Sequence, residues 1–197
     1  MIIRLFFFTI IFLGFNASYI IKSTHASSKL GKIEFPTSGS GVAQHHFISG
    51  VAALHSFWYP EALKEFKNST KADPNFAMGY WGEAMAHNAP LWERQDSKSA
   101  KAALSKISDL SELTQREQDY IQAVQLLYGK GEKKARDKAY SNAMKKIYIK
   151  YPKDLEAACF YSLSLLGIAR NTGGEIKLKV DSGAIALEVY EQNPDHP

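Results

Sequence analysis

The chain has 197 residues, which is enough for one domain with a hydrophobic core, and its 45% hydrophobic and 22% charged residues are ordinary for a globular protein. The net charge of +4 includes Arg4 and Lys22, and the chain after residue 26 holds 22 basic and 20 acidic side chains. This balance excludes the strongly basic face that nucleic-acid-binding proteins usually carry, so we expect no nucleic-acid partner.

Residues 1–26 have the features of an export signal, namely Arg4, an apolar run at 5–15 and small residues before the end of the segment. The apolar run is shorter than the ~20 residues that span a membrane. The alternative is an uncleaved anchor at residues 5–21, and a membrane contact is expected only in that case. Both alternatives predict an exported protein, periplasmic if the source is a Gram-negative bacterium.

Residues 27–41 are rich in Gly, Ser and Pro and predict a linker, followed by one helical domain at 42–197. The domain has helical hydrophobic periodicity and no sustained alternation, which predicts an all-α fold. We expect helices at 42–57, 60–72, 76–87, 97–107, 114–128, 135–150, 155–169 and 181–192.

The helix ends are marked by caps and prolines. Asp96 or Ser97 is expected to cap the fourth helix, and Thr114 with Glu117 has the spacing of a capping box. Prolines at 74, 152 and 194 follow predicted helices at intervals of 78 and 42 residues. If the first interval holds two units, helical pairs recur at a nearly constant period, which predicts a solenoid of stacked pairs.

The first two units carry a repeat signature: Gly50, Ala62, Phe66 and Pro74, then Tyr80 and Ala84. The first four residues are separated by 12, 4 and 8 positions, which resembles the consensus of the tetratricopeptide repeat (TPR). That repeat is a pair of antiparallel helices of about 34 residues, and the resemblance implies about four such pairs. It also implies that Gly50 packs closely against the region of Ala62, and that Phe66 fills the wedge before the next pair.

The resemblance extends to a group of exported bacterial repeat proteins from about residue 43 onward. It is carried by the blocks "LHSFWYPEALKEFKNSTKADPNFAMGYWGEAMAHN", "LTQREQDYIQAVQLLYG", "ARDKAYSNAMKKIYIKYPKDLEAACFYSLSLLG" and "NPDHP". The resemblance implies export and repeat architecture, but no reaction. It also implies a solenoid that lacks its C-terminal cap, so we expect Leu187 and Tyr190 to be exposed and to favour self-association, a partner at that end or a further segment downstream. The alternative is that the N-terminal linker or signal region covers this face.

In tetratricopeptide repeats the first helix of each pair lines a concave groove. By position, the groove residues are Gln44, Phe47, Val51, Leu54 and His55, then Met78, Trp81, Met85 and Asn88. An apolar strip edged by hydrogen-bonding groups is typical of surfaces that bind an amphipathic helix or an extended peptide. We therefore predict a noncatalytic scaffold for a peptide or protein partner, with Trp81 at least partly exposed. The alternative is that these residues pack against a neighbouring helix or a terminal cap.

One class of partner is excluded by this groove. Phe47 and Val51 stand where repeats that bind acidic chaperone tails carry Lys and Asn. A carboxylate placed against these side chains would lose its water without gaining a hydrogen bond.

The histidines do not form a recognisable metal motif. His45 and His46 are adjacent, His46 and His55 fall on opposite sides of a helix, and His45 lies too far along the axis from His55 to share an ion. The sequence has no HExxH motif and no cysteine pair. We therefore predict no metal and no cofactor, with packing roles for His46 and His87.

Templates for catalysis are also missing. The sequence contains no GxSxG motif, no P-loop and no dinucleotide fingerprint, and its single cysteine, Cys159, lies in an apolar run typical of a buried thiol. We predict that the chain is not an enzyme. The alternative is a histidine-dependent metal-binding protein or hydrolase that further sequence would complete.

Overall fold

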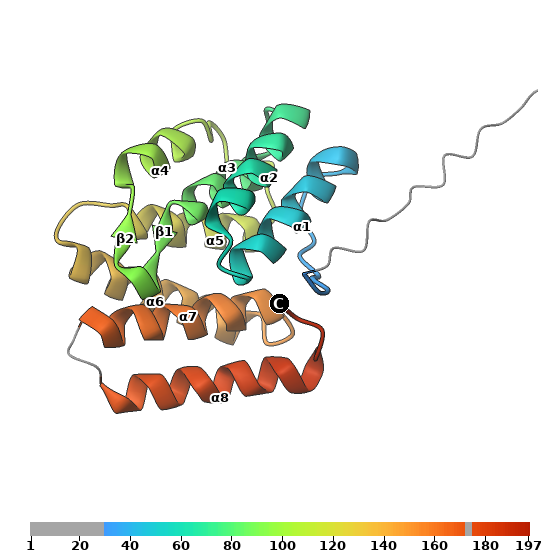
Figure 1. Cartoon of the computed structure of the whole chain (residues 1–197). Helices are drawn as coiled ribbons and strands as arrows, with labels where there is room; N and C mark the ends of the chain where they lie inside the picture. Colours follow the sequence, from blue (N-terminus) through green and yellow to red (C-terminus); the bar gives the residue numbers. More distant parts are fainter. Residues whose placement is uncertain (1–29, 172–174) are drawn as a thin grey trace, which may run out of the picture.

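The computed structural model describes residues 30–171 and 175–197, and its regular secondary structure is almost entirely helical (Figure 1). The predicted all-α class is confirmed, whereas the tetratricopeptide type stays a prediction. The predicted signal at 1–26 lies outside the described residues. Among those described, no helix is both long and apolar enough to cross a membrane.

The helices are α1 (Gly41–His55), α2 (Tyr59–Ala72), α3 (Ala77–Ala86), α4 (Ser97–Leu104), α5 (Gln115–Leu127), α6 (Lys133–Lys150), α7 (Leu155–Asn171) and α8 (Ile176–Gln192). Between α3 and α4, strand β1 (Asn88–Ala89) pairs antiparallel with β2 (Arg94–Gln95) around a turn of 3-10 helix at Pro90–Trp92. The last helix begins at Ile176 rather than at the predicted Asp181.

Both predicted caps are present. The Asp96 side chain accepts a hydrogen bond from the Ser99 N–H at the start of α4, and Thr114 forms a capping box with Glu117 at the start of α5. The Glu117 carboxylate also accepts hydrogen bonds from the backbone N–H and the hydroxyl of Ser38, at 2.8 and 2.9 Å. The cap therefore also fixes the segment that precedes α1.

Neighbouring helices in the chain pack on one another, from α1 to α4 and again from α5 to α8. Helix α3 is central, because it also contacts α1 and α5. Helices α7 and α8 run side by side in opposite directions, with α8 at the outer edge (Figure 1). The chain then turns back from α8 toward the start of α7 (Figure 1).

Phe66 of α2 fits between two glycines on different helices. A Cβ atom added at Gly50 of α1 would lie 2.7 Å from the Phe66 ring, and one added at Gly82 of α3 would lie 2.2 Å from it. The close approach predicted for Gly50 is therefore present, and its contact is Phe66, one turn beyond Ala62. Glycine is required at both positions because any side chain would displace the ring.

The centre of the core is aromatic. The Trp81 ring centroid lies 5.6 Å from that of Phe35, 5.7 Å from Tyr120 and 5.4 Å from Phe160. Three of these rings come from α3, α5 and α7, while Phe35 comes from the predicted linker and is only 1% exposed. The segment before α1 has no helix or strand, yet it supplies part of the core.

Candidate metal centre

The residues predicted to line a groove form the interior of the protein instead. Phe47, Val51, Met78 and Trp81 are 0% exposed, and Leu54 and Met85 are each 5% exposed. The prediction that Trp81 is partly exposed is therefore wrong. The physical reason is that Phe35, Tyr120 and Phe160 cover the face where a concave surface was expected.

The polar groove residues are also engaged within the fold. Gln44 Nε2 donates a hydrogen bond to the Phe35 carbonyl oxygen at 2.9 Å, and Gln95 Nε2 donates to Asn88 Oδ1 at 3.0 Å. Most of the repeat signature is interior too: Ala62, Phe66 and Ala84 are 0% exposed and Tyr80 is 8% exposed, while Pro74 is at the surface. These positions therefore agree with the alternative interpretation, in which the predicted groove residues pack against neighbouring helices.

His55 is the groove residue with the most informative surroundings. It is the last residue of α1, and its Nε2 lies 2.6 Å from Oε2 of Glu156 in the first turn of α7. The other oxygen of that carboxylate, Oε1, lies 3.0 Å from Nε2 of His196, which follows α8. One carboxylate therefore lies between two imidazole rings.

All three side chains are removed from solvent. Their exposed fractions are 7% for His55, 1% for Glu156 and 4% for His196. A buried carboxylate is stable only when it is paired with positive charge and hydrogen-bond donors. The two rings supply the partners that this one needs.

The C-terminal segment is held in place from the opposite end of the described chain. The Lys32 N–H donates a hydrogen bond to the Asp195 carbonyl oxygen at 2.9 Å, and Asn193 Nδ2 donates to the Lys32 carbonyl oxygen at 3.0 Å. The His196 N–H donates to the Asn193 carbonyl oxygen at 3.0 Å and closes the turn. These bonds position the His196 ring against α7.

The pKa values of Glu156 and His196 are set by competing effects. Burial acts to raise the pKa of Glu156, but the charge of His55 and hydrogen bonds from both rings outweigh it and lower that pKa to about 2. Burial acts to lower the pKa of His196, but contacts with Cys159 and Glu156 outweigh it and raise that pKa to about 10. We attribute the direction for His196 to Glu156, because the Cys159 Sγ lies 3.9 Å from each ring nitrogen and so points at neither lone pair.

Cys159 borders this cluster as a neutral thiol. Burial raises its pKa, which agrees with the predicted structural role of a cysteine in an apolar run. The other described histidines of the first half lie elsewhere. His46 Nδ1 is 2.6 Å from Glu65 Oε2, His45 is exposed, and burial lowers the pKa of His87.

Two spaces border the cluster. His55 lines a cavity of about 30 Å³, room for about one water molecule. Glu156 and His196 line a wider, open hollow of about 750 Å³ whose rim includes Lys32, Arg116 and Lys153. The carboxylate thus lies between the protein interior and a path to solvent.

The cluster has the composition of a transition-metal site. One ligand atom from each of His55, Glu156 and His196 can be chosen so that all three lie within 4.8 Å of one another. Two imidazoles and one carboxylate are a ligand set used for Zn²⁺ and for Fe²⁺, with metal–ligand distances of about 2 Å. Small side-chain shifts would bring these donors around one ion.

Comparisons with protein-family models, with characterised proteins and with solved structures found no match for this chain. By its fold and its site, the chain is an all-α protein with a buried histidine–carboxylate–histidine cluster.

Proposed function

We propose that this chain is a helical scaffold of the tetratricopeptide type that binds one divalent transition-metal ion through His55, Glu156 and His196. The observation that carries the proposal is the convergence of three buried metal-ligating side chains on donor atoms within 4.8 Å of one another. Zn²⁺ is the first candidate, because proteins bind it through two histidines and one glutamate and because the ion itself has no strict geometric preference.

Charge supports this assignment. The Glu156 carboxylate is anionic at a buried position and already has two imidazole nitrogens directed at it, at 2.6 and 3.0 Å. A divalent ion would replace the positive charge that protonated His196 now supplies, and each Nε2 would contribute its lone pair to the ion in place of a proton to the carboxylate.

The site also explains what the ion would do for the protein. His55 is separated from Glu156 by 101 positions, and Glu156 from His196 by 40. An ion bound by all three would join α1, α7 and the C-terminal segment. Because such a site does not exist in the unfolded chain, metal binding would stabilise the folded state.

The test is metal binding by the purified full-length chain after chelation and dialysis. We expect Co²⁺, a spectroscopic substitute for Zn²⁺, to titrate to about one ion per chain and to be displaced by Zn²⁺. His55→Gln and His196→Gln should each weaken binding by at least ~100-fold, because loss of a ligand exceeds the 10–100-fold cost of losing a supporting residue.

His45→Gln is the matched control, since His45 is an exposed histidine on the same helix, α1. It should bind Co²⁺ like the unsubstituted chain. Circular dichroism would establish that each variant is folded before its affinity is compared. Equal Co²⁺ affinity in the unsubstituted chain and in folded His196→Gln, or no binding by the unsubstituted chain, would refute the proposal.

Export and partner binding complete this proposal. Residues 1–26 support export, and the helical scaffold supports the second candidate function, which is binding of a protein or peptide partner. With the predicted groove residues buried, the observation that favours a partner is an exposed apolar face on α8, where Leu187 is 56% and Tyr190 is 61% exposed.

A further inference from the structure

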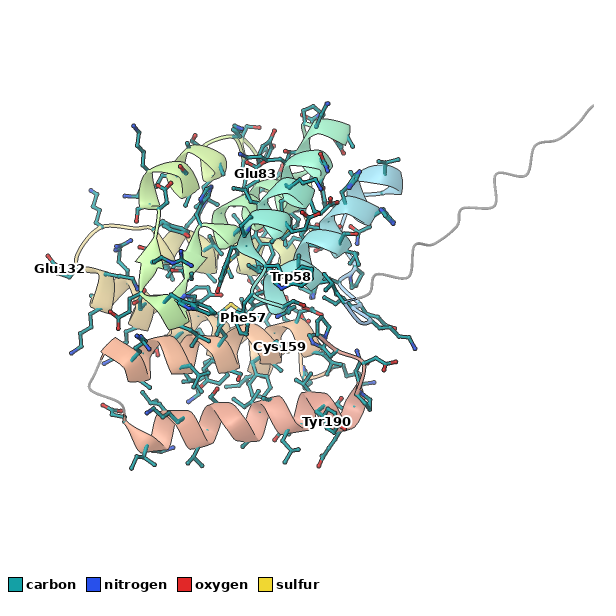
Figure 2. All side chains as sticks on the ribbon, viewed as in Figure 1. Phe57, Trp58, Glu83, Glu132, Cys159 and Tyr190 are labelled. Carbon is teal, nitrogen blue, oxygen red and sulfur yellow. The ribbon has the colours of Figure 1, made fainter. Side chains whose placement is uncertain are left out.

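Helix α8 has an apolar face that no described part of the chain covers. Its buried face carries Ser182, Ile185 and Val189, which are directed at α7. The exposed face carries Ile176 at 77%, Val180 at 63%, Leu187 at 56% and Tyr190 at 61% exposed. Figure 2 labels Tyr190 near the C-terminal end of α8, at the edge of the molecule.

The exposed residues follow the spacing of a coiled-coil seam. We define the α8 stripe as Ile176, Val180, Gly183, Leu187 and Tyr190. The intervals are 4, 3, 4 and 3 residues, the alternation that keeps one line of side chains facing a second helix. The stripe runs along most of the helix, about 21 Å at 1.5 Å per residue.

The stripe is nearly symmetric about its centre. If two copies of α8 lie antiparallel with Gly183 opposite Gly183, Ile176 faces Tyr190, and Val180, three residues before the centre, lies within one residue of the level of Leu187, four residues after it. Gly183 has no neighbouring atom within 4 Å of the position that a Cβ would occupy, so its backbone is open to close approach. Each large residue at one end meets a large residue at the other.

The charges beside the stripe select the same orientation. Lys177 and Lys179 flank its first half and Glu191 flanks its second half, whereas the Glu188 carboxylate accepts a hydrogen bond from the Tyr148 hydroxyl of α6 at 3.0 Å. An antiparallel pair places Lys177 beside Glu191 of the second copy, whereas a parallel pair would place like charges together. Within the helix Lys177 is paired with Asp181 at 2.6 Å, and the Lys177 side chain is 81% exposed.

We propose that the α8 stripe is a self-association surface whose partner is the α8 stripe of a second copy, in antiparallel orientation about Gly183. This inference is independent of the metal-binding proposal and names the partner for the second candidate function. Each copy contributes only one helix to the contact, so the buried area is small. Small interfaces are weak, and we expect dimer formation to depend on protein concentration.

Cysteine crosslinking tests the orientation. Gly183→Cys in the full-length chain should give a disulfide-linked dimer under mild oxidation, because the two substituted positions face each other. Ile176→Cys should give little dimer alone, and a mixture of Ile176→Cys and Tyr190→Cys chains should crosslink. Strong crosslinking of Ile176→Cys with itself, or no crosslinking of Gly183→Cys, would overturn the proposal; the unsubstituted chain controls for Cys159.

Light scattering across a range of protein concentrations tests the association itself. The unsubstituted chain should move from monomer toward dimer in the micromolar range, and Leu187→Glu should shift the midpoint at least ~10-fold higher. Ile149→Glu is the matched control, because Ile149 is 65% exposed on α6 and lies outside the stripe. An unsubstituted chain that stays monomeric, or an equal effect of Ile149→Glu, would exclude the α8 stripe as the contact.

Discussion

The Trp81 region and α8 use the same kinds of residues in opposite ways. Around Trp81, apolar side chains from α1, α3, α5, α7 and the segment before α1 meet with almost no exposed surface. On α8, residues equally apolar by type remain at the surface, where Leu187 is 56% exposed. Periodicity identifies the apolar face of a helix, but only the fold determines which face another segment covers.

The largest expected effect comes from emptying the centre of the core. Trp81→Ala should lower the free energy of unfolding by about 3–5 kcal/mol, because it leaves a cavity among the rings of Phe35, Tyr120 and Phe160. Denaturant unfolding would measure the loss. Trp58→Ala is the control, since Trp58 is 58% exposed, and similar losses for the two variants would show that Trp81 is not buried as described.

A somewhat smaller effect is expected where α7 meets the C-terminal segment. In metal-free protein, Glu156→Gln should lower the free energy of unfolding by about 3 kcal/mol, because the two buried rings lose their negative partner. Glu112→Gln, at an exposed position, should change it by less than about 0.5 kcal/mol. Equal effects in chemical denaturation would show that the carboxylate contributes no more than a surface charge.

Two glycines should respond with opposite signs, which sharpens the contrast between the core and α8. Gly50→Ala should destabilise by about 1–3 kcal/mol, because its Cβ would meet the Phe66 ring. Gly183→Ala should stabilise the monomer by about 0.5–1 kcal/mol through helix propensity, since no atom lies within 4 Å. Thermal unfolding at low protein concentration would decide. A stabilising Gly50→Ala would contradict the packing described for Phe66, and a destabilising Gly183→Ala would contradict the open surroundings of Gly183.

The smallest effect is expected on the α8 stripe. Leu187→Ala should change the free energy of unfolding by less than about 0.5 kcal/mol, because the side chain makes few contacts in the monomer. Denaturant unfolding at low concentration would check this. A loss above about 2 kcal/mol would mean that Leu187 is covered, as core substitutions behave.

Much of the fold follows from local chemistry. The capping box of Thr114 and Glu117, the Asp96 cap and the helical periodicity are short-range signals, and the structure contains all three features. The tight contact of Gly50 also followed from spacing within one helical pair. Phe35 was not predictable in this way, because nothing near it in sequence indicates that its side chain enters the core.

The candidate site was predictable only in part. The sequence places His55 among the predicted groove residues, and its spacing from His45 and His46 indicates no shared ion. Its partners, Glu156 and His196, lie on α7 and after α8, so their convergence depends on the packing of the whole chain. The signal that was present is an acidic residue, Glu156, at the head of the apolar run "AACFYSLSLLGIA", where a buried charge requires a partner.

The hydrogen bonds between Lys32 and the turn at Asn193 have a consequence for the order of folding. They join positions 161 residues apart, and contacts of such long range cost the most loop entropy. These hydrogen bonds become favourable once the packing of α1 to α8 has brought Lys32 and Asn193 close together. Because a chain is synthesised from its N-terminus, His55 is made early and His196 is made late. A metal ion that needs both histidines would therefore bind only to molecules that have completed folding.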